Sequence, residues 1–243
     1  MTTFVFAATL LAAAVPAHAD WTGKGEAGLV LASGNTDTET ANTKLAMTNE
    51  TDDWKLSLGA AGLYASDEEG QTAQRWEVFE QLNWKFTQRN FLFSAGRYEQ
   101  DEFSGFEYQA IASGGVGRTF QDSGNTKSTG TLGVGYKFFE TRDAFDDITG
   151  ALIEEGDSDK EVVFRGTLDF EHQFTATTSL INKFIVESGA ENTFAQNDLN
   201  LLVKMTDVLA LAVGYSVRHN TQPPDEFQET DTLTTINLVY EIR

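Results

Sequence analysis

The sequence of 243 residues contains no cysteine. Disulfide bonds and metal sites with thiolate ligands are therefore excluded. Proline is also scarce, with three residues against 21 glycines. Because proline removes a hydrogen-bond donor from the interior of a sheet, its scarcity favours long, uninterrupted β-strands.

Long apolar runs are absent after residue 20. A transmembrane helix needs about 18 or more consecutive apolar residues, so none is expected there. Basic residues are few, since 17 Lys and Arg stand against 37 Asp and Glu, for a net charge of −20. This charge repels nucleic-acid phosphates, and we expect no nucleic-acid partner. The apolar content of 40% argues against a disordered chain.

The first twenty residues differ in character from the rest. An apolar stretch, FVFAATLLAAAV, is followed by Ala17-His18-Ala19, which places small residues where signal peptidase requires them. No Lys or Arg precedes the stretch, although a typical signal has one, and the alternative is a buried N-terminal helix. We expect residues 1–19 to be a signal peptide, and residues 20–243 to form one exported domain.

From residue 21 onward the sequence repeats one pattern, in which a segment of alternating polarity is followed by a polar turn. In EVVFRGTLDFEHQF, alternate positions hold Val162, Phe164, Leu168 and Phe170, and Arg165 lies between them. A period of two predicts strands. Twelve such segments are present, at residues 21–33, 41–47, 54–65, 75–85, 91–98, 108–120, 131–139, 161–174, 180–188, 199–205, 209–217 and 236–242.

One residue breaks the alternation. Glu80 falls among the apolar positions of its segment, between Val78 and Leu82. A β-bulge or a register shift at this point would explain it.

The connections between the segments are of two kinds. Short ones span residues 49–53, 87–90, 121–127, 175–179 and 206–207, and longer acidic ones span 66–74, 99–107, 141–161 and 221–231. Short turns at one end and longer loops at the other are typical of an outer-membrane barrel with periplasmic turns and extracellular loops. An even number of strands places both termini in the periplasm.

A soluble β-sandwich alternates in the same way, so other features must decide. Soluble strands average about 5–6 residues, whereas membrane strands need about 9–11, and these segments are long. The polar faces of the segments carry charged residues in mid-strand, so few other side chains remain that could form the core of a soluble protein. Aromatic residues lie near the strand ends on the apolar face, as two lipid–water interfaces would select. Those toward the short turns are Trp21, Trp54, Trp84, Phe120, Phe174 and Tyr240, and those toward the long loops are Tyr64, Trp76, Tyr136 and Tyr215.

We therefore predict an all-β fold, a transmembrane antiparallel up-and-down β-barrel of about 12 strands with its apolar side chains outward. Closure of the barrel leaves no strand edge with unpaired backbone N–H and C=O groups exposed to lipid. A lipocalin-like barrel of eight strands would leave a third of the segments unused.

By the same parity the charged strand residues face the lumen. The basic ones are Lys24, Lys44, Lys55, Arg75, Lys85, Lys137, Arg165, Lys183, Lys204 and Arg218, and the acidic ones are Glu26, Glu77, Asp169, Glu171, Glu187 and Asp198. They could pair across the strands and close the lumen. Alternatively, they could line a narrow channel whose basic wall favours anionic or zwitterionic solutes. Twelve strands lie between the filled eight-stranded barrels and the 16-stranded porins, so both interpretations stay open.

No enzymatic site and no cofactor are expected. His172 and His219 are the histidines beyond the signal, and neither lies in a nucleophile motif. The acidic stretches at residues 67–70 and 157–161 could offer oxygen ligands to Ca²⁺ or another divalent cation. They do not match the spacing of an EF-hand loop, and solvated loops are the expected reading.

Several segments resemble one known family, namely GEAGLVLASGNTDTET, DEFSGFEYQA, GGVGRTF, SGAENTF and the C-terminal strand. Over essentially the whole exported domain the sequence resembles the YdiY-like family of outer membrane proteins. This family is called domain of unknown function 481, and its members are named as salt-induced. Family members usually have Arg where this chain has Gln109, and usually end on an aromatic residue where this chain ends in YEIR.

The resemblance implies a barrel inserted into the lipid bilayer of the outer membrane by the outer-membrane assembly machinery, and it implies no established activity. We expect a monomer with a structural or envelope-stress role, or a narrow pore. A membrane-embedded hydrolase, and a surface module whose acidic loops bind cations or a partner, are the alternatives.

Overall fold

The computed structural model describes residues 21–32, 38–67, 70–102, 104, 106–145, 152–190, 192–223 and 228–242. The predicted signal peptide, residues 1–19, lies outside the described residues and stays a prediction. In the described part of the chain no helix is long and apolar enough to cross a membrane.

The described chain consists of strands joined by turns. They are β1 (Trp21–Ala32), β2 (Thr38–Glu50), β3 (Trp54–Asp67), β4 (Gly70–Lys85), β5 (Asn90–Asp101), β6 (Phe106–Ser123), β7 (Thr126–Thr141), β8 (Ala144–Phe145), β9 (Leu152–Glu154), β10 (Ser158–Gln173), β11 (Thr178–Ser188), β12 (Thr193–Lys204), β13 (Leu209–Asn220) and β14 (Thr230–Ile242).

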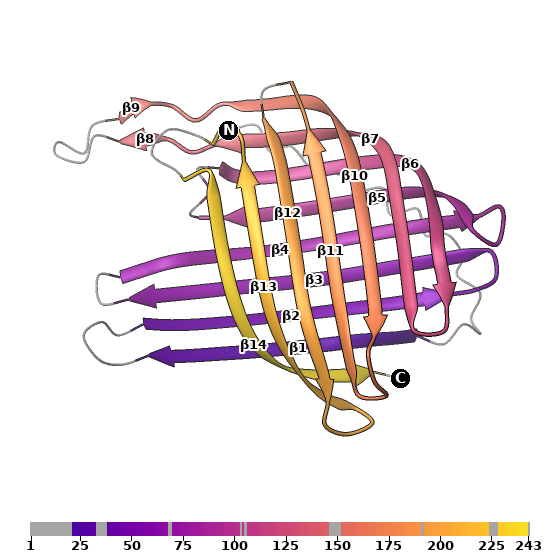
Figure 1. Ribbon diagram of the computed structural model, residues 1–243. Helices are drawn as coiled ribbons and strands as arrows, with labels where there is room; N and C mark the ends of the chain where they lie inside the picture. The colour runs from indigo at the N-terminus through magenta and orange to yellow at the C-terminus, as the bar shows by residue number, and fades with distance from the viewer. Residues whose placement is uncertain are drawn as a thin grey trace.

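Twelve of these strands form one closed barrel, and β8 and β9 form a separate small hairpin (Figure 1). The order around the ring is β1-β14-β13-β12-β11-β10-β7-β6-β5-β4-β3-β2. Each barrel strand pairs antiparallel with its neighbours, so the chain runs up and down. The predicted all-β barrel of twelve strands is confirmed, and each of the twelve alternating segments lies largely within one barrel strand.

Two connections predicted as long loops are mostly strand. The ladder between β3 and β4 continues to Asp67 and Gly70, and β5 runs to Asp101 before β6 starts at Phe106. Their polar sequences indicate contact with water. Because paired strands can continue beyond the apolar band into water, the polarity of the sequence did not show where the strands end. The described part of the 141–161 connection continues into the hairpin of β8 and β9, which projects beyond the barrel (Figure 1).

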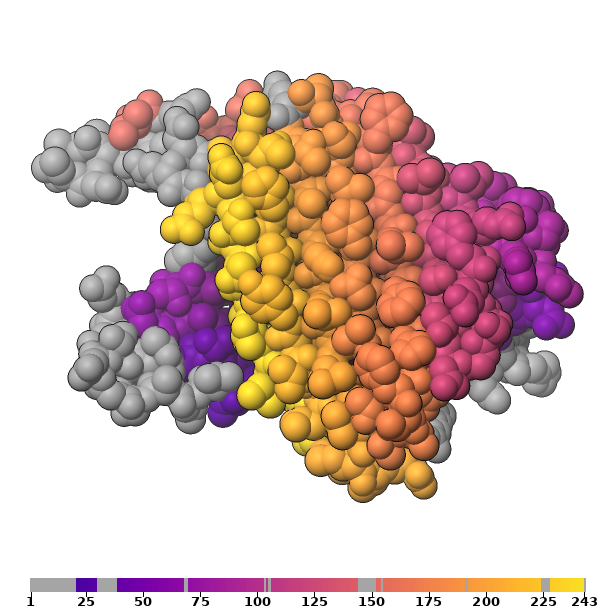
Figure 2. Space-filling view, in the orientation of Figure 1, coloured from indigo at the N-terminus to yellow at the C-terminus, as the bar shows by residue number. Residues whose placement is uncertain are grey.

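Apolar side chains cover the outside of the barrel. The wall of β10 to β14 forms a continuous surface in Figure 2, and its outward residues include Phe164, Leu211 and Ile236. All ten aromatic residues predicted for the belts are exposed. At the short-turn end Trp54 contacts Trp84, with ring centroids 6.3 Å apart. The role of the ten residues at two lipid interfaces stays a prediction.

The inside is less polar than expected. The expectation that little besides charge would fill the interior was wrong, because many apolar side chains are buried there: Phe91, Phe93, Phe106, Ile111, Val163, Phe194, Leu202, Ala210, Ala212 and Val239. Several of these strands are apolar on both faces. Phe91 and Phe93 are buried, whereas Leu92 between them is exposed.

Glu80 lies in regular strand. It pairs with Leu58 on β3 and with Gly96 on β5 without any shift, and the one shift in the β3–β4 ladder lies at Ala65/Ser66. The anticipated bulge or register shift at Glu80 was therefore wrong. Its side chain is exposed on the outer face, as are those of Val78 and Trp84.

The ring closes at the seam between β1 and β14. Among the described residues this ladder runs only from Gly23/Ile242 to Gly28/Asn237. At its last rung Asn42 donates a hydrogen bond to Asn237 Oδ1 over 3.0 Å, and Asn237 donates to Glu26 Oε2 over 3.4 Å. The amide oxygens of Asn42 and Asn237 occupy the place where a side chain of residue 28 would begin. A side chain at residue 28 would therefore displace both amides and crowd the backbone of Ile236.

We predict that Gly28→Val prevents closure of the seam. Its Cβ would collide with both amides and would lie 2.9 Å from the carbonyl oxygen of Ile236. Gly25→Val is the matched control on the same strand, because a Cβ at residue 25 meets nothing within 4 Å. On unheated gels the Gly28→Val protein should lose the band of the folded barrel, and the control should keep it. Equal folding of the two variants would contradict this account of the seam.

Candidate functional site

A group of charged side chains crosses the lumen in the half of the barrel nearer the long loops. We call it the ion cluster, and it consists of Arg75, Arg97, Glu99, Asp101, Arg165, Glu187 and Arg218. The side chains of Glu99 and Glu187 are each only 2% exposed. Buried carboxylates are stable only when cations and hydrogen bonds compensate the lost water.

Two carboxylates share three guanidinium groups at the centre of the cluster. Arg97 Nη2 lies 2.7 Å from Glu187 Oε2, and its Nη1 lies 3.2 Å from Glu99 Oε2. Arg218 Nη2 lies 2.6 Å from Glu99 Oε1, and Arg165 Nε lies 3.5 Å from Glu187 Oε1. Each carboxylate therefore has two arginine partners. The contacts of Arg97 and Arg218 are charge-assisted hydrogen bonds, which are stronger than neutral ones. Arg165 and Glu187 instead form an ion pair without a hydrogen bond.

The contact between Glu99 and Arg218 joins opposite walls. Glu99 lies on β5 and Arg218 on β13, and these strands stand six places apart in the ring of twelve. Asp101, also on β5, lies 3.9 Å from both Arg218 and Arg75. Since the bonded side chains meet across the full width of the ring, they close the centre of the lumen at this height.

Aromatic rings support the cluster from the inner wall. The ring of Phe194 lies 5.2 Å from the guanidinium of Arg97 and 5.1 Å from that of Arg218. Phe93 lies under Arg165 at 5.8 Å. Guanidinium groups are attracted to ring faces, most strongly where water is excluded. The rings therefore hold the arginines in place and keep the centre of the cluster dry.

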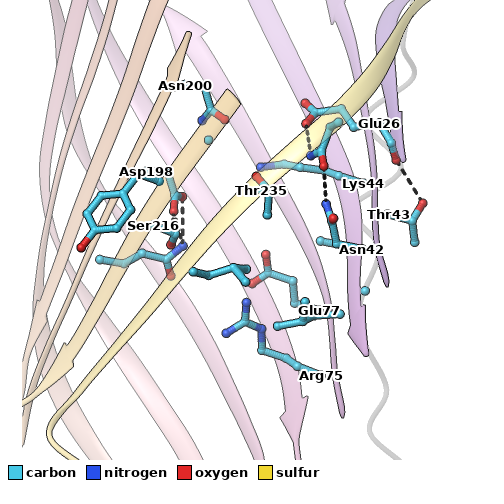
Figure 3. A pocket seen from close by; sticks show the side chains of 18 residues that line it. Glu26, Asn42, Thr43, Lys44, Arg75, Glu77, Asp198, Asn200, Ser216 and Thr235 are labelled. Carbon is cyan, nitrogen blue, oxygen red and sulfur yellow. Dashed lines mark hydrogen bonds between the residues drawn. The ribbon is translucent and has the colours of Figure 1, made fainter. Parts of the chain in front are cut away.

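Two cavities remain beside the cluster, along the wall formed by β1 to β4 and β12 to β14. The smaller has a volume of about 140 Å³, and its charged lining residues are Glu26, Lys44, Arg75, Glu77 and Asp198. In Figure 3 Arg75 and Glu77 approach it from one side, and Asp198 and Ser216 from the other. Ser216 donates a hydrogen bond to Asp198 over 2.6 Å.

The larger cavity has a volume of about 290 Å³ and lies nearer the long loops. Its charged lining residues are Arg75, Asp101, Arg218 and Asp231. The two cavities share four lining residues, which are Leu63, Arg75, Ser216 and Leu233. They are therefore adjacent along one wall, and they pass beside the ion cluster rather than through it.

Five residues predicted to line the lumen lie in or beside the cluster: Arg75, Lys137, Arg165, Glu187 and Arg218. Lys137 is buried, and its Nζ lies 5.6 Å from the ring of Phe106 and 5.3 Å from that of Phe139. Four others, Glu26, Lys44, Glu77 and Asp198, line the smaller cavity.

The remaining predicted residues lie toward the short turns. Lys55 and Lys85 lie 3.7 Å and 2.6 Å from Glu50, and Lys204 lies 3.3 Å from Glu241. In the ladders, Lys24 is the partner of Glu241, Lys183 stands between Asp169 and Asp198, and Glu171 is the partner of Lys127. Asp169, Glu171 and Lys183 are exposed. The assignment of the whole set to the lumen stays a prediction.

Sequence reasoning missed the centre of the cluster. Arg97, Glu99 and Asp101 follow one another at a period of two on β5, which is the signal that could have found them. Arg97 was missed because Phe91 to Phe93 are apolar on both faces, which left the parity of this strand ambiguous. Glu99 and Asp101 were missed because residues 99–107 were predicted to be an acidic connection. Phe194 was missed because nothing in the sequence marks it as a partner of arginine.

The histidines contact hydroxyl groups and aromatic rings. His172 Nδ1 lies 2.8 Å from Thr126 Oγ1, and its ring packs between Phe170 and Phe174. His219 Nδ1 lies 2.8 Å from Thr230 Oγ1. Within the described residues no three His, Asp or Glu side chains gather closely enough to hold a metal ion. Of the acidic stretch at residues 67–70, Glu68 and Glu69 lie outside the described residues.

Comparison with known sequences gives a family and a distant relative. A family model described as "Protein of unknown function, DUF481" matches residues 25–242. The Escherichia coli (strain K12) protein described as "Uncharacterized protein YdiY" is 24% identical over 223 residues, which cover 90% of this chain and 82% of that protein. The predicted family resemblance is confirmed.

Comparison with solved structures gives the fold. The translocator domain of the autotransporter NalP from Neisseria meningitidis superimposes with a TM-score of 0.53 and 9% identity, over 94% of this chain and 91% of that chain. The COG4313 outer membrane channel from Pseudomonas putida F1 superimposes with a TM-score of 0.54 and 10% identity, over 92% of this chain and 96% of that chain. The fold is therefore that of an outer-membrane barrel.

We predict that Arg218→Met destabilises the barrel by about 3 kcal/mol, because it leaves a buried carboxylate with one partner fewer. Removing Glu99 in addition, as Glu99→Leu, should restore much of the loss, since no unpaired charge is then left. Unfolding by denaturant in detergent micelles measures both.

Lys127→Met is the control for the loss of a charge pair. Lys127 and Asp122 lie 3.8 Å apart with side chains 69% and 62% exposed, and such surface pairs contribute about 1 kcal/mol or less. If Arg218→Met were as mild as Lys127→Met, the cluster would have no stabilising role.

Proposed function

The chain belongs to the DUF481 family of proteins of unknown function, and we propose that it is a narrow aqueous pore of the outer membrane for small polar solutes. The observation that carries the proposal is the pair of adjacent polar cavities beside the ion cluster. The cluster closes the centre of the lumen, and the cavities leave a route along one wall.

The route has three parts. It begins at the larger cavity, between Asp231 and Arg218 near the long loops. It continues past Arg75 and Ser216 into the smaller cavity. Below this cavity, toward the short turns, the exposed side chain of Lys183 indicates that the lumen is not filled there. With about 140 Å³ at its smaller cavity, the route admits small solutes only.

The charges along the route favour solutes that carry both signs. The smaller cavity has two basic residues, Lys44 and Arg75, and three acidic ones, Glu26, Glu77 and Asp198. The larger has two of each sign. Because cations and carboxylates face each other at short range, a zwitterion meets a partner for each of its charges. A purely anionic solute meets repulsion from the carboxylates, so the balance supports the zwitterionic choice.

The family and fold comparisons support the setting of this proposal. The Pseudomonas putida protein of similar fold is described as an outer membrane channel, although 10% identity carries the fold alone. In our proposal the protein is exported through the signal at residues 1–19 and inserted into the bilayer by the assembly machinery. The short turns face the periplasm and the long loops face outward. The proposal includes no enzymatic activity.

A second candidate is a closed structural barrel with a role in envelope stress. The contact between Glu99 and Arg218 favours it, because it ties opposite walls together. The two candidates differ in one measurable property, the passage of ions.

We predict that the wild-type barrel gives small, discrete conductance steps in planar bilayers, and that Glu99→Ala/Arg218→Ala raises the step several-fold. Removing both side chains opens the centre of the lumen. Because Glu99 and Arg218 are removed together, neither is left as a buried charge without the other. Leu132→Ala is the control, since Leu132 is 71% exposed on the outer wall and its truncation should not change conductance. If the wild type never conducts while the double variant does, the protein is the closed structural barrel.

We predict that Arg75→Glu shifts the reversal potential in a KCl gradient toward that of a cation-selective pore. Arg75 lines both cavities, so this change alters the charge at the point where they join. Lys127→Glu makes the same change of charge at an exposed position near the start of β7, and Lys127 lines neither cavity. An equal shift in the two variants would mean that ions do not pass Arg75.

A further inference from the structure

One carboxylate stands in the middle of the lipid-facing wall. Glu80 lies on β4 four residues after Trp76 and four residues before Trp84, and all three side chains are exposed on the same face. Both tryptophans belong to the predicted aromatic belts, which places the ends of the apolar band of this strand at Trp76 and Trp84. Because the strand is regular between them, Glu80 lies at the depth where hydrocarbon surrounds the barrel.

Nothing within the barrel compensates this group. Among the described residues Glu80 has no hydrogen-bonding or ionic partner. Its neighbours in the ladders are Leu58 and Gly96, and its carboxylate lies over Gly96, where a Cβ would stand 3.4 Å from Glu80 Oε1. An ionisable side chain within the membrane is unfavourable unless it is neutralised and hydrogen-bonded. Lipid tails supply no hydrogen bond.

The surface beside Glu80 is shallow. The outward residues of β5 and β6 next to it are small, and they are Ser94, Gly96, Ala110, Ala112 and Gly114. Tyr98 and Tyr108 border this surface toward the long loops, with stacked rings 5.9 Å apart. Small residues allow a second wall to approach closely in a membrane. Glu80 and these five residues together are called the Glu80 patch.

We propose that the Glu80 patch is the contact face of a homodimer, in which the Glu80 carboxyl groups of two copies meet near a two-fold axis. A protonated carboxyl group both donates and accepts hydrogen bonds, so two identical groups satisfy each other. A two-fold interface places the same surface of each copy against itself. The patch contains no basic residue, and self-pairing needs none.

The dimer replaces the expectation of a monomer, and it is independent of the pore. The patch lies on the outer wall of β4 to β6, whereas the lumen route lies inside the barrel. Conductance therefore tests the proposed function, and association tests the dimer.

Cysteine cross-linking tests the contact directly. The native chain has no cysteine, so Ser94→Cys provides a single thiol in the patch. After mild oxidation in bilayers at low protein density, we expect a disulfide-linked dimer on non-reducing gels. Val213→Cys is the matched control, because Val213 is 46% exposed on β13, which stands opposite β5 in the ring. It should stay monomeric.

Substitution of Glu80 tests whether its carboxyl group causes the association. In the Ser94→Cys background, Glu80→Leu should reduce the cross-link several-fold while the barrel still folds, as the gel shift on heating reports. Glu80→Gln should keep most of the cross-link, because an amide also donates and accepts hydrogen bonds. The proposal is overturned if Ser94→Cys cross-links no better than Val213→Cys, or if Glu80→Leu leaves the yield unchanged. It is also overturned if Ser94→Cys cross-links in native membranes only to a different protein.

Discussion

The hydrogen-bonded ring of backbone groups is the constraint on which the rest of the structure depends. In hydrocarbon an unpaired N–H or C=O has no partner, so a β-sheet can cross a membrane only when its first strand pairs with its last. Here β1 pairs with β14 and completes a ring of twelve. The alternation of side chains then becomes an inside and an outside. Apolar residues such as Phe164 face lipid, and charged residues such as Arg165 face the lumen.

The ion cluster follows from this division of faces. Charges excluded from the outer wall gather in a ring narrow enough for long side chains to meet across it. Glu99 and Arg218 do so from opposite walls, and Phe194 fills the space between two of the arginines. The pairing offsets part of the penalty for burying the charges. It also leaves the lumen asymmetric, with side chains packed on one side and polar cavities on the other.

Local alternation in the sequence was sufficient to predict the strands, the outer face and several residues of the cluster. Arg165 and Glu187 were assigned to the inside because they alternate with outward apolar residues such as Phe164 and Val186. The method failed on β5 for two reasons. Phe91 to Phe93 are apolar on both faces, so the side of Arg97 was ambiguous, and the polar residues 99–107 were taken as a loop, so Glu99 and Asp101 were missed. It also could not tell which charges would meet, since Arg97 and Glu187 are 90 positions apart. Glu80 appeared as an irregularity of the strand, and only the register showed that the strand is regular and the residue itself is unusual.

The position of the seam has a consequence for assembly. Ten of the barrel ladders join strands that are consecutive in the chain. The β7–β10 ladder joins two strands separated by the connection that contains β8 and β9. The seam instead brings together Glu26 and Asn237, which are separated by 211 positions. Bringing such distant residues together is the slowest kind of contact to form. The hydrogen bond between Asn42 and Asn237 beside Gly28 therefore forms after the intervening strands are in place. A chain that lacks either terminal strand can form every ladder among its remaining strands and still remain an open sheet with two unpaired edges.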